Sequence, residues 1–319
     1  MRHDKHKTPK HVSQCLQLAI LLEVSAHKPG NVNRTVGFQS TRYEHFLASA
    51  IAVEPSFARA AHRGLLVSEG KIEPKEIGIG KIVKKAISDI DAWQRGGNTL
   101  LGTVLLFSPI AAAAGMMMLN ERQDAAIPKI RENVKLVVES TTPSDAVNVY
   151  EAINIAKPNG MVGKAPALDV NNPKSKRIIL QKGISLYDIF KISAPYDSIS
   201  KEWIENYALT FQVGLPYFIQ QLEDIGDLNT AIIHAFLHVL SIVPDTLIAR
   251  KVSLKKAKQV SETARKILSL GGLTTPQGKE KLAKFDRELR RIDNRFNPGT
   301  TADIIAAVLA IAILNGYRP

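Results

Sequence analysis

Apolar residues recur along most of the chain at the three- and four-residue spacing of amphipathic helices. In the first such stretch, Val12, Leu16 and Ile20 share one side. Continuing the same spacing places Glu23 on that apolar side. A carboxylate on a core-facing stripe is costly unless it is paired or hydrogen-bonded. The pattern therefore predicts a helix whose C-terminal end carries a buried acid.

The same periodicity predicts a series of further helices. They cover residues 42–68, 81–95, 127–139, 142–156, 199–223, 227–243, 246–268, 277–294 and 300–314, and a short apolar segment covers 184–191. Residues 157–185 are the least regular part, and neither an alternating strand pattern nor an internal repeat is present. The predicted fold class is all-α, with about ten or more helices. One compact catalytic domain over residues 13–319 would follow a basic disordered tail over residues 1–12.

Residues 100–119 contain no charged side chain. Their length would suffice to span a membrane, but they include Gly102, Ser108, Pro109 and Gly115. The rest of the chain offers no other span with which this one would pair. We therefore expect a buried central helix and no membrane partner.

The composition agrees with a large core, because hydrophobic residues make up 45% of the 319 positions. The 42 Lys and Arg residues exceed the 30 Asp and Glu residues, which gives a net charge of +12. Such a charge suits anionic partners such as nucleic acid, polyphosphates or a membrane surface, and it is also typical of a solvated surface. The single cysteine, Cys15, excludes an internal disulfide, and residues 1–11 lack the apolar stretch of a signal peptide. Both observations favour a cytoplasmic location.

Four polar clusters lie at predicted helix ends. The first surrounds a turn at Pro29-Gly30 and contains Glu23, Lys28, Asn31, Asn33 and Arg34. It is interpreted either as a functional site or as a helix terminus with an ion pair and a turn. The second, Gly96-Gly97-Asn98-Thr99, precedes the uncharged helix. A helix N-terminus suits phosphate, and an ordinary break between two helices is the alternative.

The third cluster is Pro244-Asp245-Thr246, followed one turn later by Arg250 and Lys251. Asp245 is a candidate for binding a metal or a sugar hydroxyl, and the two cations are candidates for phosphate. The alternative is a capped helix with a surface ion pair. The fourth cluster covers residues 297–303, where Thr300 and Asp303 have capping-box spacing. Its functional interpretation is a second anion or Mg²⁺ site at the mouth of a buried helix.

His234 and His238 lie four residues apart, so both could face one metal ion. Ala235 stands where zinc-dependent hydrolases of the His-Glu-x-x-His type carry glutamate, so packing or surface positions are the preferred interpretation. The chain has no P-loop and no glycine-rich dinucleotide motif after a strand. Signatures of helix-turn-helix, zinc-finger and RNA-binding proteins are also absent from the sequence.

Together, the polar clusters are more specific than any one of them. Four segments occur in this order: Lys28-Pro29-Gly30-Asn31-Val32-Asn33-Arg34, Gly97-Asn98-Thr99-x-x-Gly102, Thr142 to Tyr150 with Asp145, and Asn297-Pro298-Gly299-Thr300-Thr301-Ala302-Asp303. With these segments the chain resembles the triphosphoribosyl-dephospho-CoA synthase family, from about residue 13 to residue 316. The resemblance implies an all-helical transferase. Such enzymes move a triphosphoribosyl group from ATP to the ribose 2′-hydroxyl of 3′-dephospho-CoA and release adenine, which makes the precursor of the prosthetic group of citrate lyase and malonate decarboxylase.

The positions that match the family's polar residues are Glu23, Lys28, Asn33, Asn98, Thr99, Asp145, Asp245 and Asp303. Two positions depart from the pattern. Members that make the citrate lyase precursor resemble Asn-Thr-His-Lys-Gly where this chain has Asn98-Thr99-Leu100-Leu101-Gly102, and they carry aspartate where it has Asn33. The chain is therefore similar to a divergent branch, and the departures bear on the acceptor and the pathway rather than on the fold.

A ribosyl transfer of this kind breaks an N-glycosidic bond through an oxocarbenium-like transition state. The site needs an acid, a base and negative charge near the sugar, and it needs cations, including Mg²⁺, for the triphosphate. We predict catalytic roles for Glu23, Asp145 and Asp245, with Glu23 as a base whose pKa is raised by burial. Asp245 and Asp303 are the predicted Mg²⁺ ligands. The predicted nucleotide and phosphate contacts are Lys28, Asn33, Arg34, Asn98, Thr99, Thr246, Arg250, Lys251, Asn297 and Thr300.

The alternative function is that of a basic helical protein that binds nucleic acid or nucleotides without catalysis. It predicts basic residues gathered on one face, whereas here they are spread along the chain. The dense stretch 277–295 also carries four acidic residues, Glu280, Asp286, Glu288 and Asp293. We therefore expect small-molecule substrates, ATP among them, and no nucleic-acid partner. A homodimer is left open.

Overall fold

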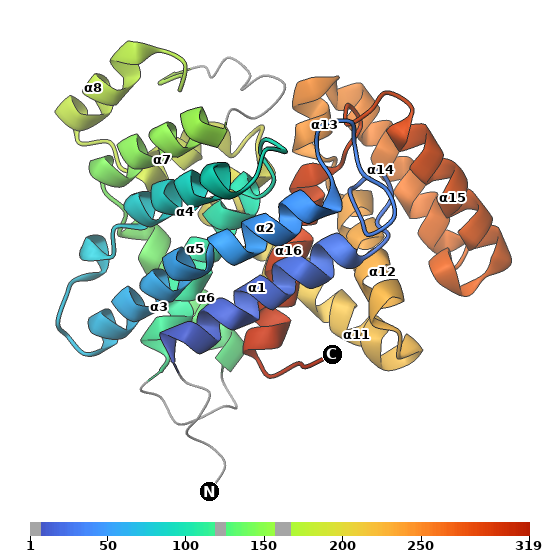
Figure 1. Cartoon of the computed structure of the whole chain (residues 1–319), viewed down its shortest axis with the longest axis horizontal. Helices are drawn as coiled ribbons and strands as arrows, with labels where there is room; N and C mark the ends of the chain where they lie inside the picture. The colour runs from blue at the N-terminus through green and yellow to red at the C-terminus, as the bar shows by residue number, and fades with distance from the viewer. Residues whose placement is uncertain (1–7, 119–125, 157–166) are drawn as a thin grey trace, which may run out of the picture.

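The structure, a computed structural model of the chain, describes residues 8–118, 126–156 and 167–319. In these three ranges every regular element is a helix, from α1 (Pro9–Ser25) to α16 (Gly299–Leu314). Figure 1 shows the helices packed into one body. The predicted all-α fold is confirmed.

Two helices, α5 (Leu101–Met116) and α16, form the centre of the molecule. Nearly every residue of both is buried, because both sequences are apolar on all sides. Helix α16 contacts α1, α5, α11 (Leu215–Ile225) and α12 (Leu228–Ile242), and Figure 1 shows it behind α1 and α2 (Tyr43–Ala52). The expected buried central helix is confirmed in α5, and α16 is a second helix of the same kind.

Helix α5 packs against α3 (Glu54–Ser68) with the two backbones in contact. A Cβ atom added to Gly64 would lie 1.9 Å from the carbonyl oxygen of Ala112, and one added to Gly115 would lie 1.9 Å from that of Ala61. Only glycine fits at either position, so the register of the two helices is fixed. This packing fixes the C-terminal half of α5, and through it the position of the N-terminus of the same helix.

Apart from α1, α2 and α3, the remaining helices form two groups on either side of this centre (Figure 1). The first contains α4 (Ile79–Trp93), α6 (Ala126–Glu139), α7 (Pro143–Ala156), α8 (Pro173–Lys182), α9 (Leu186–Ser193) and α10 (Ser198–Ile204). The second contains α11, α12, α13 (Thr246–Lys251), α14 (Leu254–Ser269) and α15 (Pro276–Arg290). Three short helical elements lie between longer helices: η1 (Pro74–Glu76) between α3 and α4, the π-helix η2 (Leu209–Gly214) between α10 and α11, and η3 (Gly272–Thr274) between α14 and α15.

Two predictions about irregular regions were wrong in part. Helix α1 begins at Pro9 with the Thr8 hydroxyl as its cap, so residues 9–12 are helical rather than part of a disordered tail. Residues 1–7 lie outside the described part of the chain. Helix α8 lies inside the stretch 157–185, where the Asn172 side chain caps its first turn. Residues 157–166 also lie outside the described part.

Three predicted helices are interrupted. The helix expected over 42–68 breaks at Val53, just before Pro55 enters the first turn of α3. The one expected over 199–223 breaks where Asn206 and Tyr207 adopt φ angles of 51° and 56°. The one expected over 246–268 breaks before Ser253, whose hydroxyl caps α14. Periodicity alone does not reveal these breaks, because the apolar residues on both sides of each break remain buried.

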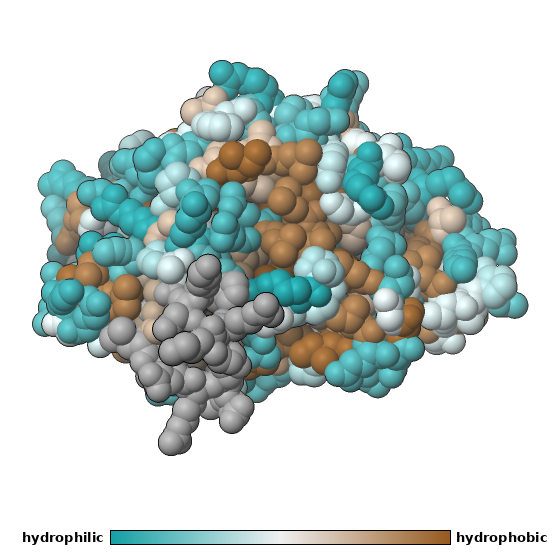
Figure 2. All heavy atoms as spheres, turned by 60° about the horizontal axis from the view of Figure 1, so that its bottom comes forward, coloured by the Kyte–Doolittle hydropathy of each residue, from teal (hydrophilic) through white to brown (hydrophobic). Residues whose placement is uncertain are grey.

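No helix in the described ranges is both long enough and apolar enough to cross a membrane. Helix α5 has 16 residues, whereas a span takes about 20. The surface is nevertheless uneven: Figure 2 shows a broad apolar area on one face, bordered by polar side chains.

Candidate functional site

A cavity of about 500 Å³ opens among the ends of several helices. Its wall is formed by the end of α1 and the loop after it, the first turns of α5 and α16, and parts of α7, α9, α10 and α13. Each of the four polar clusters contributes to this wall, for example through Glu23, Asn98, Arg250 and Asp303. Clusters that are far apart in the sequence therefore converge on one cavity.

Glu23 forms a buried ion pair at this cavity. It is 6% exposed, and its partner Lys28 is fully buried, with the Lys28 Nζ atom 3.0 Å from Glu23 Oε1. The same ammonium donates to the backbone carbonyls of Glu23 and Ala26. Burial raises the pKa of Glu23 and lowers the pKa of Lys28, and in each case the partner's charge opposes the shift. Lys28 thus lies behind the acid and does not line the cavity.

Asp303, which is half-buried, is the second carboxylate of the cavity wall. The Thr103 hydroxyl donates to Asp303 Oδ1 at 2.5 Å, across the interface between α5 and α16. Burial, followed by the weaker repulsion of the Glu23 and Asp245 carboxylates, raises the pKa of Asp303 to about 8. A Cβ atom on Gly102 would lie 2.1 Å from Asp303 Oδ2, so the glycine makes room for this carboxylate.

Of the two interpretations of the fourth cluster, the capping box between Thr300 and Asp303 is absent from the structure. Helix α16 begins at Gly299 without a side-chain cap, and the Asp303 carboxylate faces α5 instead of its own helix end. The backbone N–H groups of Gly299 and Thr300 have no acceptor within the described part of the chain, and both residues line the cavity. A free helix N-terminus of this kind attracts anions.

Two cationic side chains from α13 also line the cavity. Arg250 Nη1 lies 2.6 Å from Asp197 Oδ1, and the guanidinium side chain is 31% exposed. Lys251 Nζ donates to the Asn294 carbonyl at 3.1 Å, and burial lowers its pKa. Together with the start of α16, they place cationic groups and N–H donors in this part of the wall.

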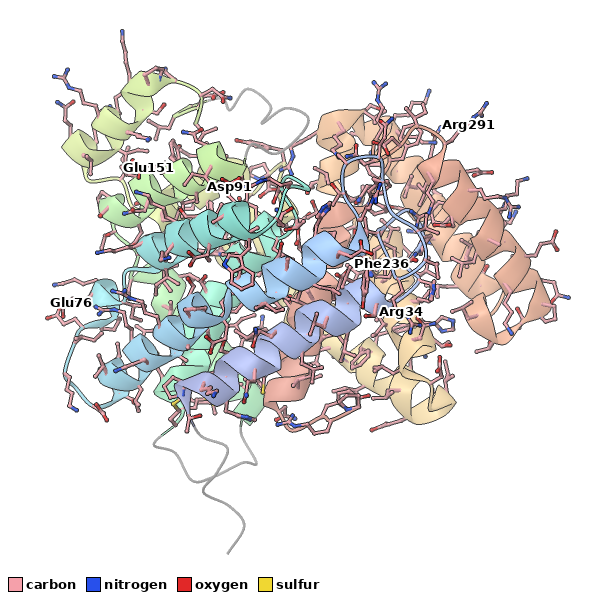
Figure 3. All side chains as sticks on the ribbon, viewed as in Figure 1. Arg34, Glu76, Asp91, Glu151, Phe236 and Arg291 are labelled. Carbon is pink, nitrogen blue, oxygen red and sulfur yellow. The ribbon has the colours of Figure 1, made fainter. Side chains whose placement is uncertain are left out.

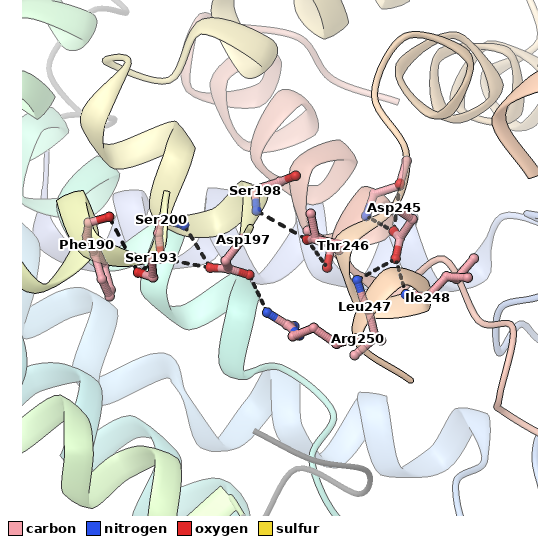
Figure 4. Close-up of polar contacts among 12 residues, drawn as sticks. Phe190, Ser193, Asp197, Ser198, Ser200, Asp245, Thr246, Leu247, Ile248 and Arg250 are labelled. Atoms are coloured by element: carbon pink, nitrogen blue, oxygen red, sulfur yellow. Dashed lines mark hydrogen bonds and ion pairs between the residues drawn. The ribbon is translucent and has the colours of Figure 1, made fainter. Parts of the chain in front are cut away.

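Asp245 does not line the cavity and is fully engaged in holding helices together. Its Oδ1 atom accepts from the N–H groups of Leu247 and Ile248 at 2.9 and 3.1 Å, which caps α13. Its Oδ2 atom accepts from the N–H and hydroxyl of Thr301, both at 2.8 Å, which ties α13 to α16. Thr246 contributes to the same joint, because its hydroxyl donates to that of Thr300 at 3.3 Å. Figure 4 shows these contacts running on to Asp197 and Arg250.

Asp145 also lies away from the cavity. One oxygen accepts from Gly80 N–H at 2.8 Å and the other accepts from the N–H and hydroxyl of Thr142, each at 2.8 Å. The first contact joins α7 to α4 and the other two form a helix cap. The carboxylates of Asp145 and Asp245 thus join helices in this structure, and their catalytic roles stay predictions.

The other predicted residues divide between the wall and the surroundings. Asn98, Thr99, Asn297 and Thr300 line the cavity. Asn33 instead organises the loop after α1, since its Oδ1 atom accepts from Thr35 and Val36 N–H groups. Arg34 is exposed on the same loop, as Figure 3 shows, and does not line the cavity.

Sequence reasoning missed the apolar wall of the cavity. This wall comes from α7, α9 and the residues between α9 and α10, and it includes Val149, Tyr150, Ile189, Phe190 and Tyr196. On amphipathic helices such residues have the same spacing as core residues, so no sequence signal separates them. Asp197 was missed for a related reason: its partner Arg250 is remote in the sequence.

The two histidines are not placed for a metal ion. His234 Nδ1 lies 2.7 Å from Gln221 Oε1, and its Nε2 accepts from Leu273 N–H at 2.8 Å. His238 stacks on Tyr217, with ring centroids 3.9 Å apart. More generally, the described residues include no group of three or more His, Cys, Asp or Glu side chains that could hold a metal.

Comparison with known proteins adds a family to this geometry. The sequence profile described as ATP:dephospho-CoA triphosphoribosyl transferase matches residues 9–319. A 2-(5''-triphosphoribosyl)-3'-dephosphocoenzyme-A synthase from Klebsiella pneumoniae is 33% identical over 92 residues, which are 29% of this chain and 30% of that protein. The synthase of the same name from Escherichia fergusonii is 34% identical over 94 residues, 30% of each chain. The aligned stretch is thus about 30% of each curated relative.

A solved structure supports the fold. The crystal structure of a protein proposed to be a triphosphoribosyl-dephospho-CoA synthase, from Archaeoglobus fulgidus, matches 85% of this chain and all of that one. The TM-score is 0.60 and the sequence identity is 23%. At this identity the likeness establishes a common helical fold.

Proposed function

The chain belongs to the ATP:dephospho-CoA triphosphoribosyl transferase family, and from that premise we propose that it transfers the triphosphoribosyl group of ATP to the 2′-hydroxyl of 3′-dephospho-CoA and releases adenine. A related ribosyl transfer from a nucleotide to a similar acceptor is the broader form of the same proposal. One observation carries it beyond family membership. A buried carboxylate, Glu23, a half-buried one, Asp303, and a free helix N-terminus flanked by two cations line one cavity.

The carboxylates match the chemistry at the sugar. In the reaction the bond between the ribose anomeric carbon and adenine breaks, and a bond to the acceptor oxygen forms. Positive charge develops on the ribose, which a nearby carboxylate stabilises. The acceptor hydroxyl must lose its proton, and we assign the role of base to Glu23, which Lys28 keeps available as a carboxylate.

The opposite part of the wall matches a triphosphate. The N–H groups of Gly299 and Thr300, with Arg250 and Lys251, are donors and cations of the kind that bind phosphate oxygens. Asn98, Thr99 and Asn297 line the same cavity and supply further polar contacts to the nucleotide. Lys28, Asn33, Arg34 and Thr246 do not line it, so their contribution would be indirect.

Mg²⁺ fits this site as a companion of ATP rather than as a resident ion. Mg²⁺ needs one or two protein carboxylates when phosphate oxygens and water supply the remaining ligands. Asp303 meets that need, because it lines the cavity and its described hydrogen bonds come from Thr103 alone, whereas the Asp245 carboxylate is held by α13 and α16. When bound, the ion would neutralise part of the phosphate charge.

The apolar wall supports a substrate with an uncharged portion. Tyr150, Phe190 and Tyr196 offer ring surfaces that suit adenine or the apolar arm of a CoA-like acceptor. Leu101 also lines the cavity. Family members that make the citrate lyase precursor have lysine at the matching position. A cation lost from this wall favours an acceptor with less negative charge there.

The test is a reaction of the purified chain with Mg-ATP and 3′-dephospho-CoA. We expect free adenine in amounts equal to an acceptor product whose mass has increased by one triphosphoribosyl group. Adenine release only with a different CoA-like acceptor would retain the broader proposal, and no adenine with any such acceptor would refute both. The absence of a nucleic-acid partner, a cytoplasmic location and the oligomeric state stay predictions, and salt-dependent filter binding, cell fractionation and sedimentation equilibrium test them respectively.

A further inference from the structure

Arg250, at the cavity wall, has hydrogen-bond donors that the described contacts do not use. Its guanidinium group carries five N–H donors, and the described contacts use only the Nη1 side, toward Asp197. Lys28, by comparison, is enclosed by Glu23 and two backbone carbonyls, and Lys251 donates to the Asn294 carbonyl. Arg250 is therefore the cation of this wall that is best able to form a bidentate contact with a ligand.

Asp197 holds that guanidinium from a fixed position. Its Oδ2 atom accepts from the N–H and hydroxyl of Ser200, at 3.0 and 2.8 Å, which caps α10. Its Oδ1 atom is left to accept from Arg250 at 2.6 Å. Ser193 supports the arrangement through a 2.7 Å bond to the Ser200 hydroxyl. Figure 4 shows this series of contacts from α9 through α10 to Arg250.

Resting on the proposed function, we infer that Asp197 is a positioning residue, which orients Arg250 to bind the phosphate chain of the nucleotide. An unheld arginine side chain has many rotamers and loses them when it binds a ligand. A carboxylate that fixes one edge of the guanidinium removes part of this cost and leaves the other edge for phosphate oxygens. Asp197 thus strengthens anion binding although it is itself an anion.

The direction in which phosphate affinity changes when Asp197 loses its charge distinguishes positioning from simple electrostatics. Removing the negative charge of Asp197 makes the cavity more positive, so electrostatics alone would strengthen the binding of a phosphate ligand. Positioning makes the opposite prediction. Asp197→Asn is the suitable variant, because asparagine caps helices about as well as aspartate and so preserves the start of α10.

The experiment measures the affinity of inorganic tripolyphosphate by titration calorimetry for the wild type, D197N, R250A, R250K and the double variant D197N/R250A. We expect R250A to weaken binding about tenfold or more, since a charge-assisted hydrogen bond is lost. D197N should weaken it severalfold, and R250K should restore only part of the R250A loss. In the double variant, D197N should add nothing, because Asp197 acts through Arg250.

The inference is overturned if D197N binds tripolyphosphate as tightly as the wild type or more tightly. It is equally overturned if D197N has the same effect with and without Arg250, or if the wild type does not bind the ligand. Circular dichroism and thermal unfolding of each variant exclude a folding defect. Steady-state kinetics should show a raised KM for ATP with little change in kcat. Binding of tripolyphosphate needs no group transfer. A wild type that binds tripolyphosphate but releases no adenine from Mg-ATP with any CoA-like acceptor therefore refutes the proposed function alone.

Discussion

The ammonium group of Lys28 lies 3.0 Å from a carboxylate oxygen of Glu23, and both side chains are buried where α1 ends at the cavity. Lys28 thereby neutralises the acid and also satisfies two backbone carbonyls of the helix terminus. The site and the end of α1 consequently depend on the same ion pair.

Replacing Lys28 by methionine should lower the free energy of unfolding by about 3–5 kcal/mol, because Glu23 would remain as an uncompensated buried charge. Urea denaturation measures the change. The double variant K28M/E23Q should recover part of the loss, since the charge is then absent. Lys75→Met is the matched control, because its ion pair with Glu73 is exposed and should matter little. Equal effects of the two lysine substitutions would contradict this view.

Asp303 should make the stability of the protein depend on pH. Its pKa is raised to about 8 in the folded chain, mainly by burial, from an ordinary value of 3.8. The unfolded chain therefore loses this proton first, and the stability contribution of Asp303 falls as pH rises from about 4 to about 8. Asp303→Asn removes the titration, so the variant should gain stability relative to the wild type across that range. Urea titrations at several pH values measure the difference.

Asp188→Asn is the control for that experiment. Hydrogen bonding, first of all from Ser185, lowers the pKa of Asp188. Its contribution is therefore complete above its unfolded-state pKa and is lost only as pH falls below it. The stability difference between D188N and the wild type should stay constant between pH 5 and pH 8. Parallel stability curves for D303N and the wild type over this range would refute the assigned environment of Asp303.

Asp245→Asn should act on stability first. The carboxylate accepts four hydrogen bonds that cap α13 and join it to α16, and an amide cannot accept all of them. We expect a loss of about 2–4 kcal/mol, as for a buried charged acceptor with several donors. Asp227→Asn, at the exposed cap of α12, is the control and should change little. An unchanged melting temperature for D245N would show that these four hydrogen bonds contribute little to stability.

Gly102→Ala should disturb the cavity through one identifiable collision. The new Cβ atom would lie 2.1 Å from Asp303 Oδ2, so the carboxylate or the start of α5 must move. We expect a loss of about 1–3 kcal/mol, which is typical of overpacking. Removing the colliding group in G102A/D303A should restore part of that stability. Thermal unfolding compares the two variants, and equal melting temperatures would place the cost elsewhere.

The hydrophobic pattern was sufficient to predict the fold class and the central helix, because the sequence of α5 is apolar on all sides. It also located Glu23 on the apolar side of α1, with Lys28 near it. The breaks at Val53 and before Ser253 escaped prediction, because a short interruption leaves the apolar period on both sides intact.

The site was only partly predictable for a different physical reason. An aspartate at a helix start has the same local sequence whether it faces a ligand or another helix. Asp145 and Asp245 turned out to hold helices together through Gly80 and Thr301, and such long-range partners leave no local signal. The pairing of Asp197 with Arg250 is hidden in the same way, because the two residues are 53 positions apart in the sequence.

The most direct test of the proposed nucleotide site is a crystal structure of the chain soaked with Mg-ATP in the absence of any acceptor. The proposed function predicts density for the nucleotide in the cavity, with phosphate oxygens at the N–H groups of Gly299 and Thr300 and the ribose between Glu23 and Asp303. Nucleotide bound with its phosphates against the wall of Tyr150 and Phe190, or outside this cavity altogether, would contradict it.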